Sequence, residues 1–309
     1  LKGWFIGMQD TVSPMITDMV VNVVNMLVSY VLAVHTPMGA LGVALGTVVA
    51  QFTGLSLAII LLLCKYRDVF RGLSIWQLAR DMQGMRSLIT LNANLFVRSL
   101  CFMVVYVGFT SLSSMYGDTD LAVCSILMKL FMLVSYFVDG FAYAGEALVG
   151  KYIGEAKSNP ISDSPSGRPI SNSPSGASEI SSLVRLLFLW SLGVGAVFTV
   201  LFALSYMPMY RMMTSDSEVL ARLTDFVGWL IAMPIVSTLA FMWDGVFTGA
   251  TAGKHIRNAM IWAAIGFVVG YVASYHHLGT HALFVGYFLH LAARVIYLTA
   301  TWRPLTSNL

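Results

Sequence analysis

Long apolar runs dominate the chain, and short polar segments separate them. Each run holds about 20 residues or more, which is the length an α-helix needs to cross the hydrocarbon core of a bilayer. Pro14 with Ser13 before it suits the start of the first run, because proline fits the opening turn and serine caps it. The pattern predicts eight membrane-spanning helices, at residues 14–34, 39–64, 87–112, 120–149, 182–208, 222–250, 258–277 and 281–302.

The composition agrees with a membrane protein. Of the 309 residues, 57% are hydrophobic and 11% are charged, whereas a soluble domain carries about 25% charged residues. The three cysteines, Cys64, Cys101 and Cys124, lack the spacing of a disulfide or metal site. The sequence therefore indicates an all-α integral membrane protein.

Lysine and arginine gather in every second connection between the runs, at residues 65–86, 150–185 and 251–257. Neither residue occurs in the intervening connections at 35–39, 115–120 and 276–281. Only the connection at 209–222 breaks this alternation, with Arg211 and Arg222 set against Asp216 and Glu218. Because positive loops stay in the cytoplasm, we expect a multi-pass protein of the plasma (inner) membrane whose C-terminus is cytoplasmic.

A segment near the start of the chain is repeated near its end. Residues 4–30 align with residues 246–272, so that Phe5 matches Phe247 and Gly7 matches Gly249. Both copies open a new span in the same direction, which favours two homologous halves related as a parallel repeat. If the halves match, about four helices would precede Leu1, and we expect an N-terminally truncated chain.

Residues 160–177 contain two tandem copies of a nine-residue Pro/Ser/Gly unit, "PISDSPSGRPISNSPSGA". Such a segment cannot bury an apolar core. It predicts a disordered cytoplasmic loop over residues 156–180.

Several ionisable residues fall inside the predicted spans, where each costs roughly 2.5 kcal/mol or more and is a functional candidate by default. They are Arg98, Asp139, Glu146, Asp244, His290 and Arg294. Asp139 and Glu146 are seven residues apart and therefore share a helix face. Asp139 is either a cavity carboxylate that binds a proton, a sodium ion or a cationic substrate, or the structural ion-pair partner of Arg98. Glu146 and Asp244 lie nearer the cytoplasmic interface, where we expect water to hydrate them, and a structural role is favoured for both.

The first two spans carry three uncharged polar residues, Asn25, Ser29 and Thr47. They are candidates for an ion or substrate cavity, or for hydrogen bonds between the two helices. The sequence shows no nucleophile–base triad, phosphate loop or metal-ligand cluster. We therefore expect neither an enzyme nor a cofactor, and no nucleic-acid partner.

Five separated stretches carry a resemblance to a known family: "GWFIGMQDTVSP", "NVVNMLVSY", "GALGVALGTVVAQ", "DGFAYAGEALVGKYIG" and "DGVFTGATAG". Together they resemble the multidrug and toxic compound extrusion (MATE) family, in its DinF-like branch. That family has twelve helices in two six-helix lobes around a central cleft. The resemblance implies part of an N-lobe at 1–64, an inter-lobe linker at 65–86, a six-helix C-lobe at 87–302 and a cytoplasmic tail at 303–309.

The resemblance also implies export of organic or drug-like compounds by alternating access, in exchange for protons or sodium. DinF-like members join an aspartate on the first helix to Asn, Asp and Thr residues on the fifth and sixth. Asn25 and Thr47 match two of these positions, but Ser29 stands where the second aspartate is expected. Asp139, Glu146 and Asp244 then become better coupling candidates. Asp139, with Arg98 setting its charge state, is the favoured cavity group, and Glu146 is expected to latch the cytoplasmic end.

Two other interpretations stay open. Arg98 and Arg294 favour an exporter of organic anions or a lipid-linked flippase of the same superfamily, and the missing helices would suit a non-transporting fragment. As partners we expect the lipid bilayer and a small organic substrate, with the protein a monomer.

Overall fold

The computed structural model describes residues 1–67, 82–158 and 174–306, and every regular element in these ranges is a helix. The chain divides into two compact units, Leu1–Arg86 and Ser87–Leu309. We describe each unit by itself.

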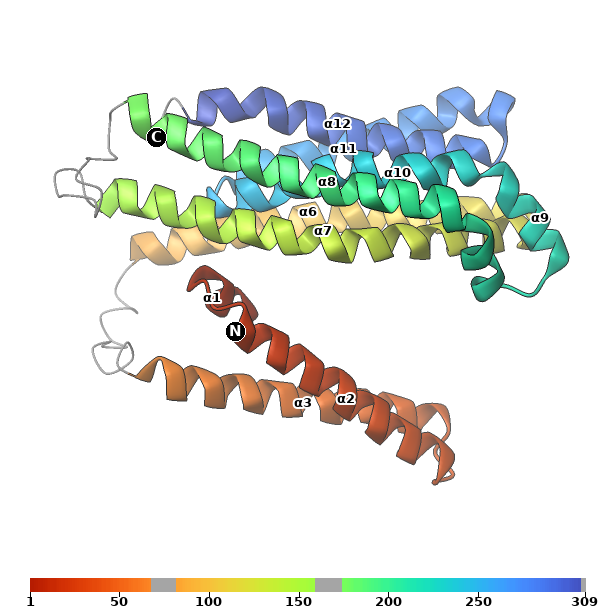
Figure 1. Ribbon diagram of the computed structural model, residues 1–309, viewed down its shortest axis with the longest axis horizontal. Coiled ribbons are helices and arrows are strands. Elements are labelled where there is room, and N and C mark those ends of the chain that lie inside the picture. Colours follow the sequence, from red (N-terminus) through yellow and green to blue (C-terminus); the bar gives the residue numbers. More distant parts are fainter. Residues whose placement is uncertain (68–81, 159–173, 307–309) are drawn as a thin grey trace. The chain divides into compact units, whose positions relative to one another are not determined.

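The first unit is a helical hairpin with a short helix before it (Figure 1). It consists of α1 (Lys2–Gly7), α2 (Val12–Val34) and α3 (Ala40–Lys65). The face of α3 that packs on α2 is made of small buried residues four apart, namely Gly42, Gly46, Ala50, Gly54 and Ala58. A Cβ atom on Gly46 would come within 2.7 Å of the backbone nitrogen of Ser29. Small residues at this spacing let two membrane helices approach closely.

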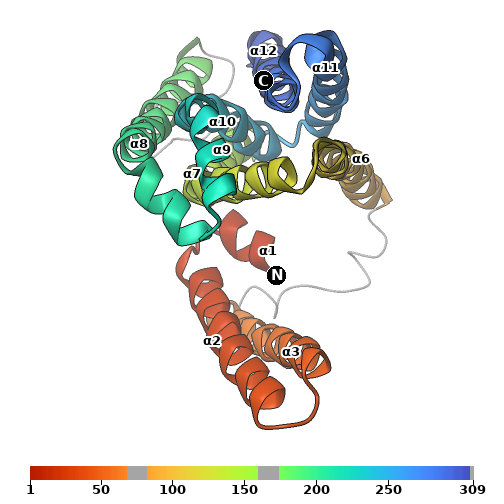
Figure 2. The same ribbon diagram turned by 90° about the vertical axis from the view of Figure 1, so that its right-hand side faces the viewer.

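The second unit is a bundle of six long helices with one short helix across an end (Figures 1 and 2). Its elements are α6 (Met82–Ser113), η1 (Ser114–Tyr116), α7 (Asp118–Ser158), α8 (Pro174–Met213), α9 (Ser217–Asp225), α10 (Val227–Gly249), α11 (Gly253–Leu278) and α12 (His281–Thr306). We call the end that holds α9 the α9 end. The opposite end holds the start of α6 and the end of α12, and we call it the basic end.

Helix α10 is the most deeply buried helix of the bundle, because 67% of the residues in its most apolar stretch are buried. It approaches α7 closely because Gly245 and Gly249 carry no side chain. A Cβ atom on either glycine would overlap a backbone carbonyl oxygen of α7, that of Ala142 or Glu146. This G-x-x-x-G contact fixes which face of α10 meets α7.

All eight predicted spans are confirmed, as helices long and apolar enough to cross a membrane in the described part of the chain. The predicted span 222–250 differs in detail, because its first residues belong to α9 and the helix breaks at Phe226. Asp216 starts α9 by accepting a hydrogen bond from the backbone nitrogen of Glu218 at 2.8 Å. A capped start favours a separate helix at this point.

The predicted connections are shorter than expected where the structure describes them. Helix α7 continues to Ser158 and α8 begins at Pro174, so the ends of the predicted loop 156–180 are helical. The centre of that loop, residues 159–173, lies outside the described residues, as do residues 68–81 of the linker and 307–309 of the tail. The assignment of the two units to lobes stays a prediction.

Candidate ion-coupling site

Asp244 on α10 is the centre of a buried charged cluster in the second unit. Its carboxylate accepts a hydrogen bond from Nε of Arg294 on α12 at 3.0 Å, and a second from Nη2 of the same residue. Nη2 of Arg98 on α6 donates to Oδ2 of Asp244 at 2.8 Å. One carboxylate therefore ties three helices together. We call Arg98, Asp244 and Arg294 the triad.

The members of the triad differ strongly in exposure. The side chains of Arg294 and Asp244 are 2% and 7% exposed, whereas that of Arg98 is 35% exposed. A buried ion pair is tolerated only when its partners are well hydrogen-bonded, and the two-pronged Arg294 contact meets this need. The Arg294 guanidinium also lies 5.2 Å from the ring centre of Phe241, where the ring face attracts a cation.

The triad carries two guanidinium groups for one carboxylate, and Asp139 on α7 is the nearby group of opposite charge. Asp139 is half-buried and interacts electrostatically with Asp244, Arg98 and Arg294. Among the described residues it has no hydrogen bond or ion pair. With Asp139 ionised, the four charges sum to zero. Its carboxylate therefore remains available to a proton or a cation.

Two expectations from the sequence need correction here. Arg98 was expected to pair with Asp139, but it pairs with Asp244 instead. Asp244 was expected to be hydrated near the interface, but it is buried. The reason is the G-x-x-x-G contact at Gly245 and Gly249, which fixes the rotation of α10 about its axis and thereby the direction in which Asp244 points.

Glu146 and His290 are the other ionisable candidates from the sequence, and neither joins the triad by a hydrogen bond among the described residues. Glu146 is half-buried two turns beyond Asp139, and within the described ranges no side chain binds its carboxylate, so its latch role stays a prediction without a visible partner. His290 is 1% exposed, and within the described part of the chain neither ring nitrogen has a hydrogen-bond partner. Its ring stacks on Tyr287, with ring centres 5.8 Å apart.

The polar set on the first two spans does come together in the first unit. The hydroxyl groups of Ser29 and Thr47 donate to Oδ1 of Asn25 at 2.9 and 3.3 Å. Both hydroxyls also lie within hydrogen-bond distance of the carbonyl oxygen of Val43, at 3.3 and 3.1 Å. The three side chains join α2 to α3 without an acid among them. Their role in ion coupling stays a prediction.

Sequence reasoning missed Asp10, which lies in the turn between α1 and α2. Its carboxylate accepts hydrogen bonds from Nζ of Lys65 at 2.7 Å, from the Ser13 hydroxyl at 2.6 Å and from the Tyr66 hydroxyl at 3.2 Å. Burial by itself would raise the pKa of Asp10, but the hydrogen bonds from Lys65 and Ser13 outweigh burial and lower the pKa to about 2. The available signal was an aspartate two residues before α2, where its carboxylate accepts a hydrogen bond from the backbone nitrogen of Ser13 in the first turn at 3.2 Å.

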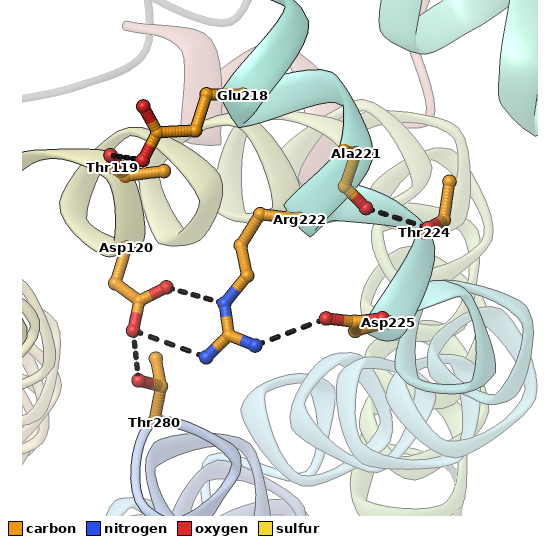
Figure 3. A network of polar contacts seen from close by, with 8 residues as sticks. All are labelled: Thr119, Asp120, Glu218, Ala221, Arg222, Thr224, Asp225 and Thr280. Carbon is orange, nitrogen blue, oxygen red and sulfur yellow. Dashed lines mark hydrogen bonds and ion pairs between the residues drawn. The ribbon is translucent and has the colours of Figure 1, made fainter.

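A second charged cluster at the α9 end was also missed (Figure 3). Nε of Arg222 on α9 donates to Asp120 on α7 at 2.8 Å, and its Nη1 donates to Asp225 at 3.0 Å. The Thr280 hydroxyl donates to Asp120, and the Thr119 hydroxyl donates to Glu218 at 3.1 Å. Except for Thr280, these residues border an open cleft of about 590 Å³. The described residues contain no cluster of three or more side chains suited to a metal ion.

Comparisons with known proteins agree on one class. No family model matches the sequence. The chain is 30% identical over 304 residues to DNA damage-inducible protein F of Escherichia coli K12, in a match that covers 98% of this chain and 61% of that protein. It is 23% identical over 308 residues to Protein DETOXIFICATION 44, chloroplastic, of Arabidopsis thaliana, with 98% and 53% covered. The chain thus spans about half to three fifths of the length of these relatives.

Solved structures show the same fold. A mutant of the Vibrio cholerae MATE transporter VcmN superposes with a TM-score of 0.79 at 16% identity, covering 98% of this chain and 64% of that one. A MATE protein in the straight conformation superposes with a TM-score of 0.83 at 14% identity, again covering 98% and 64%. The chain is therefore a multi-pass helical membrane protein with the fold of MATE transporters. Its sequence is similar to that of DNA damage-inducible protein F, and its fold is similar to that of MATE transporters.

Proposed function

We propose that the protein to which this chain belongs is a secondary active transporter, which exports small organic compounds in exchange for protons or sodium by alternating access. Its relationship to DNA damage-inducible protein F over 98% of the chain and its MATE fold support this proposal. By the distribution of lysine and arginine, the basic end and the C-terminus face the cytoplasm of a plasma (inner) membrane. We propose that the transporter works as a monomer.

The observation that carries the coupling mechanism is the unpartnered carboxylate of Asp139 beside the triad. A guanidinium bound to Asp139 would hold it ionised, but both arginines hydrogen-bond Asp244 instead. Asp139 can therefore load and release an ion, while Asp244 serves as a permanent counter-ion.

Loading Asp139 changes the charge balance of the bundle. When a proton or a sodium ion neutralises Asp139, the triad keeps a net charge of one positive unit in a poorly hydrated place. Arg98 is the member free to respond, because it is 35% exposed and contacts a single carboxylate oxygen. A shift of Arg98 would link ion binding on α7 to the position of α6, which is what exchange between two conformations requires.

Efflux from proteoliposomes tests the proposal, using the protein in its natural full length under imposed proton or sodium gradients. We compare the native protein with Asp139→Asn and with Asp118→Asn, an exposed acid on the same helix. Ion-driven efflux should be lost in Asp139→Asn and kept in Asp118→Asn, with both variants unfolding within a few degrees of the native protein. Ion-dependent efflux that survives in Asp139→Asn would contradict Asp139 as the coupling group, and absence of gradient-driven efflux in the native protein would contradict the antiporter.

A further inference from the structure

Arg257, near the start of α11, is an arginine that the structure holds without a carboxylate. Its Nη1 donates to Oδ1 of Asn94 on α6 at 3.0 Å. Its Nε and Nη2 both donate to Oδ1 of Asn258, at 3.1 and 2.9 Å. The first turn of α11 contains no acidic residue, and among the described residues Arg257 has no ion pair. Both partners are neutral amides, so the guanidinium keeps its full positive charge without a bound counter-ion.

The two asparagines that hold Arg257 are themselves fixed by other contacts. Nδ2 of Asn94 donates to the carbonyl oxygen of Thr90 at 2.9 Å, and Nδ2 of Asn258 donates to the hydroxyl of Tyr297 at 3.3 Å. Each amide therefore turns its oxygen toward the guanidinium. An arginine has five N–H donors, and one N–H on each terminal nitrogen remains available beyond these contacts. A guanidinium held in one orientation with donors to spare fits the oxygens of a phosphate group.

Lys254 adds a second cation to the same turn. It lies three residues before Arg257, so the two side chains are neighbours on one side of α11. Lys254 is exposed, and within the described ranges it has no hydrogen bond or ion pair. The helix that begins here, Gly253–Leu278, is long and apolar enough to cross a membrane. Its first turn therefore lies at the level of the lipid headgroups, where phosphates supply negative charge.

An exposed apolar stripe runs along α11 from these two cations. Ile261, Ile265 and Val268 follow Arg257 by four, eight and eleven residues, which places them on the same side of the helix. They are 38%, 45% and 56% exposed, whereas Ala263 on the opposite side is fully buried. Val268 lies about 16 Å from Arg257 along the helix at 1.5 Å per residue. This is about half of the 30 Å hydrocarbon core, or the depth of one leaflet.

We propose that Arg257, Lys254 and this stripe form a binding site for one anionic phospholipid. The phosphate accepts hydrogen bonds from the guanidinium and the ammonium, and an acyl chain lies along Ile261, Ile265 and Val268. The two cations by themselves would suit any phosphate, and the apolar stripe beneath them is what selects a lipid. The site is separate from the proposed coupling group Asp139 and does not depend on transport.

Lipid binding to the purified full-length protein tests this site, measured by native mass spectrometry. The probes are phosphatidylglycerol, the zwitterionic phosphatidylcholine and the soluble sn-glycerol 3-phosphate. The variants are Arg257→Gln, Lys254→Gln and the control Lys151→Gln, an exposed lysine at the same end of the bundle whose partner Glu155 lies 3.9 Å away. Thermal unfolding in detergent without added lipid reports that each variant is folded. Lys254→Gln should unfold at the native temperature, because no described side chain binds Lys254.

The native protein should bind phosphatidylglycerol more tightly than phosphatidylcholine. Arg257→Gln should weaken phosphatidylglycerol binding about tenfold, because hydrogen bonds between charged groups are lost. Lys254→Gln should weaken it about fivefold, since one cation near the membrane surface is removed. Lys151→Gln should bind this lipid as the native protein does, and phosphatidylcholine binding should stay the same in all variants.

Unchanged phosphatidylglycerol binding in either Arg257→Gln or Lys254→Gln would overturn the proposal. Equal binding of the two lipids by the native protein would also overturn it. Displacement of phosphatidylglycerol by an equal concentration of sn-glycerol 3-phosphate would show a site for soluble phosphates and would contradict the lipid site. None of these outcomes bears on ion-driven efflux, so the lipid site and the proposed antiporter stand or fall separately.

Discussion

Two charged networks in the second unit differ in their ratio of carboxylates to guanidinium groups and in their exposure to water. The triad holds one carboxylate between two guanidinium groups, with Arg294 and Asp244 only 2% and 7% exposed. The network at the α9 end holds one guanidinium between two carboxylates. Arg222 and Asp225 are 39% and 51% exposed, and Asp120 is 12% exposed. Water hydrates the unmatched charge at the α9 end. Inside the bundle the unmatched charge needs a protein group, and Asp139 supplies it.

This difference in exposure and charge predicts different roles for the two networks. An exposed ion pair contributes little free energy, because both charges are also stable in water. A buried pair whose partner is removed leaves an uncompensated charge, which is costly. We therefore expect the triad to stabilise the folded protein and to respond to ion binding at Asp139. We expect the α9 network to fix the positions of α7, α9 and the start of α12 relative to one another.

The largest effect should come from Asp244→Asn, which leaves the guanidinium of Arg294 without its counter-ion. Breaking a buried pair in this way costs about 3–5 kcal/mol. Thermal unfolding of the purified protein measures the loss, with Asp225→Asn as the matched control at an exposed pair. Equal stability of the two variants would contradict the role assigned to burial.

Gly245→Ala should be the next most damaging change. The added Cβ would overlap the carbonyl oxygen of Ala142 and push α10 away from α7, whereas a Cβ on Gly140 of α7 meets nothing within 4 Å. Overpacking of this kind costs about 1–3 kcal/mol. Unfolding of Gly245→Ala and the control Gly140→Ala should differ by that amount. Equal destabilisation of Gly140→Ala would show that replacing any glycine of the bundle lowers stability, and would contradict the role of the contact between α10 and α7.

A pH-dependent effect is expected at Asp10, whose buried carboxylate is bound by a half-exposed lysine. Its pKa lies at about 2 in the folded protein against about 3.9 for an unperturbed aspartate. A lowered pKa stabilises the fold at pH values above about 3.9, and this contribution is lost as the pH falls through about 2. Asp10→Asn should therefore lower the unfolding temperature at neutral pH. The difference from the native protein should shrink between about pH 4 and about pH 2, and a difference that stays constant with pH would contradict the ionised state of Asp10.

The smallest effect is expected for Arg222→Gln. An exposed pair contributes about 0.2–1 kcal/mol, and salt screens it. The unfolding temperature should drop slightly at low ionic strength and approach that of the native protein at high ionic strength. Lys254→Gln, an exposed basic residue at the other end of the bundle, is the control. A large loss that salt does not reduce would mean that the α9 network is buried in the working protein.

Contacts within one helix could be predicted from the sequence. Of the contacts between helices, the hydrogen bond of Thr47 to Asn25 was among the alternatives, but the partners of Arg98 and Asp10 were not. The spans were predictable because a run of about 20 apolar residues can cross a membrane as one helix, and a helix satisfies its backbone hydrogen bonds within the segment. Asn25 and Ser29 were placed together because a four-residue spacing is a property of a single helix. The partner of Arg98 was not predictable, since it depends on how α10 is rotated about its axis. Asp10 was overlooked because its partner Lys65 is 55 residues away.

The boundary between α9 and α10 was missed for a related reason. The residues from Val219 to Val236 have a hydrophobic pattern that fits one continuous helix, first amphipathic and then apolar. This periodicity does not show that the helix ends inside the segment. The structure ends α9 at Asp225 and stacks Phe226 on His281, with ring centres 4.1 Å apart. A tertiary contact with the start of α12 therefore accompanies the break.

The most direct test of the central claim is to observe the ion-binding carboxyl group itself. Infrared difference spectroscopy of the full-length protein in lipid reports protonated carboxyl groups as the pH is changed or sodium is added. Our account predicts a protonated-carboxyl band that sodium or substrate alters in the native protein and in Asp225→Asn, and that is missing in Asp139→Asn. The same band persisting unchanged in Asp139→Asn would show that another acid carries the ion, and would contradict the account.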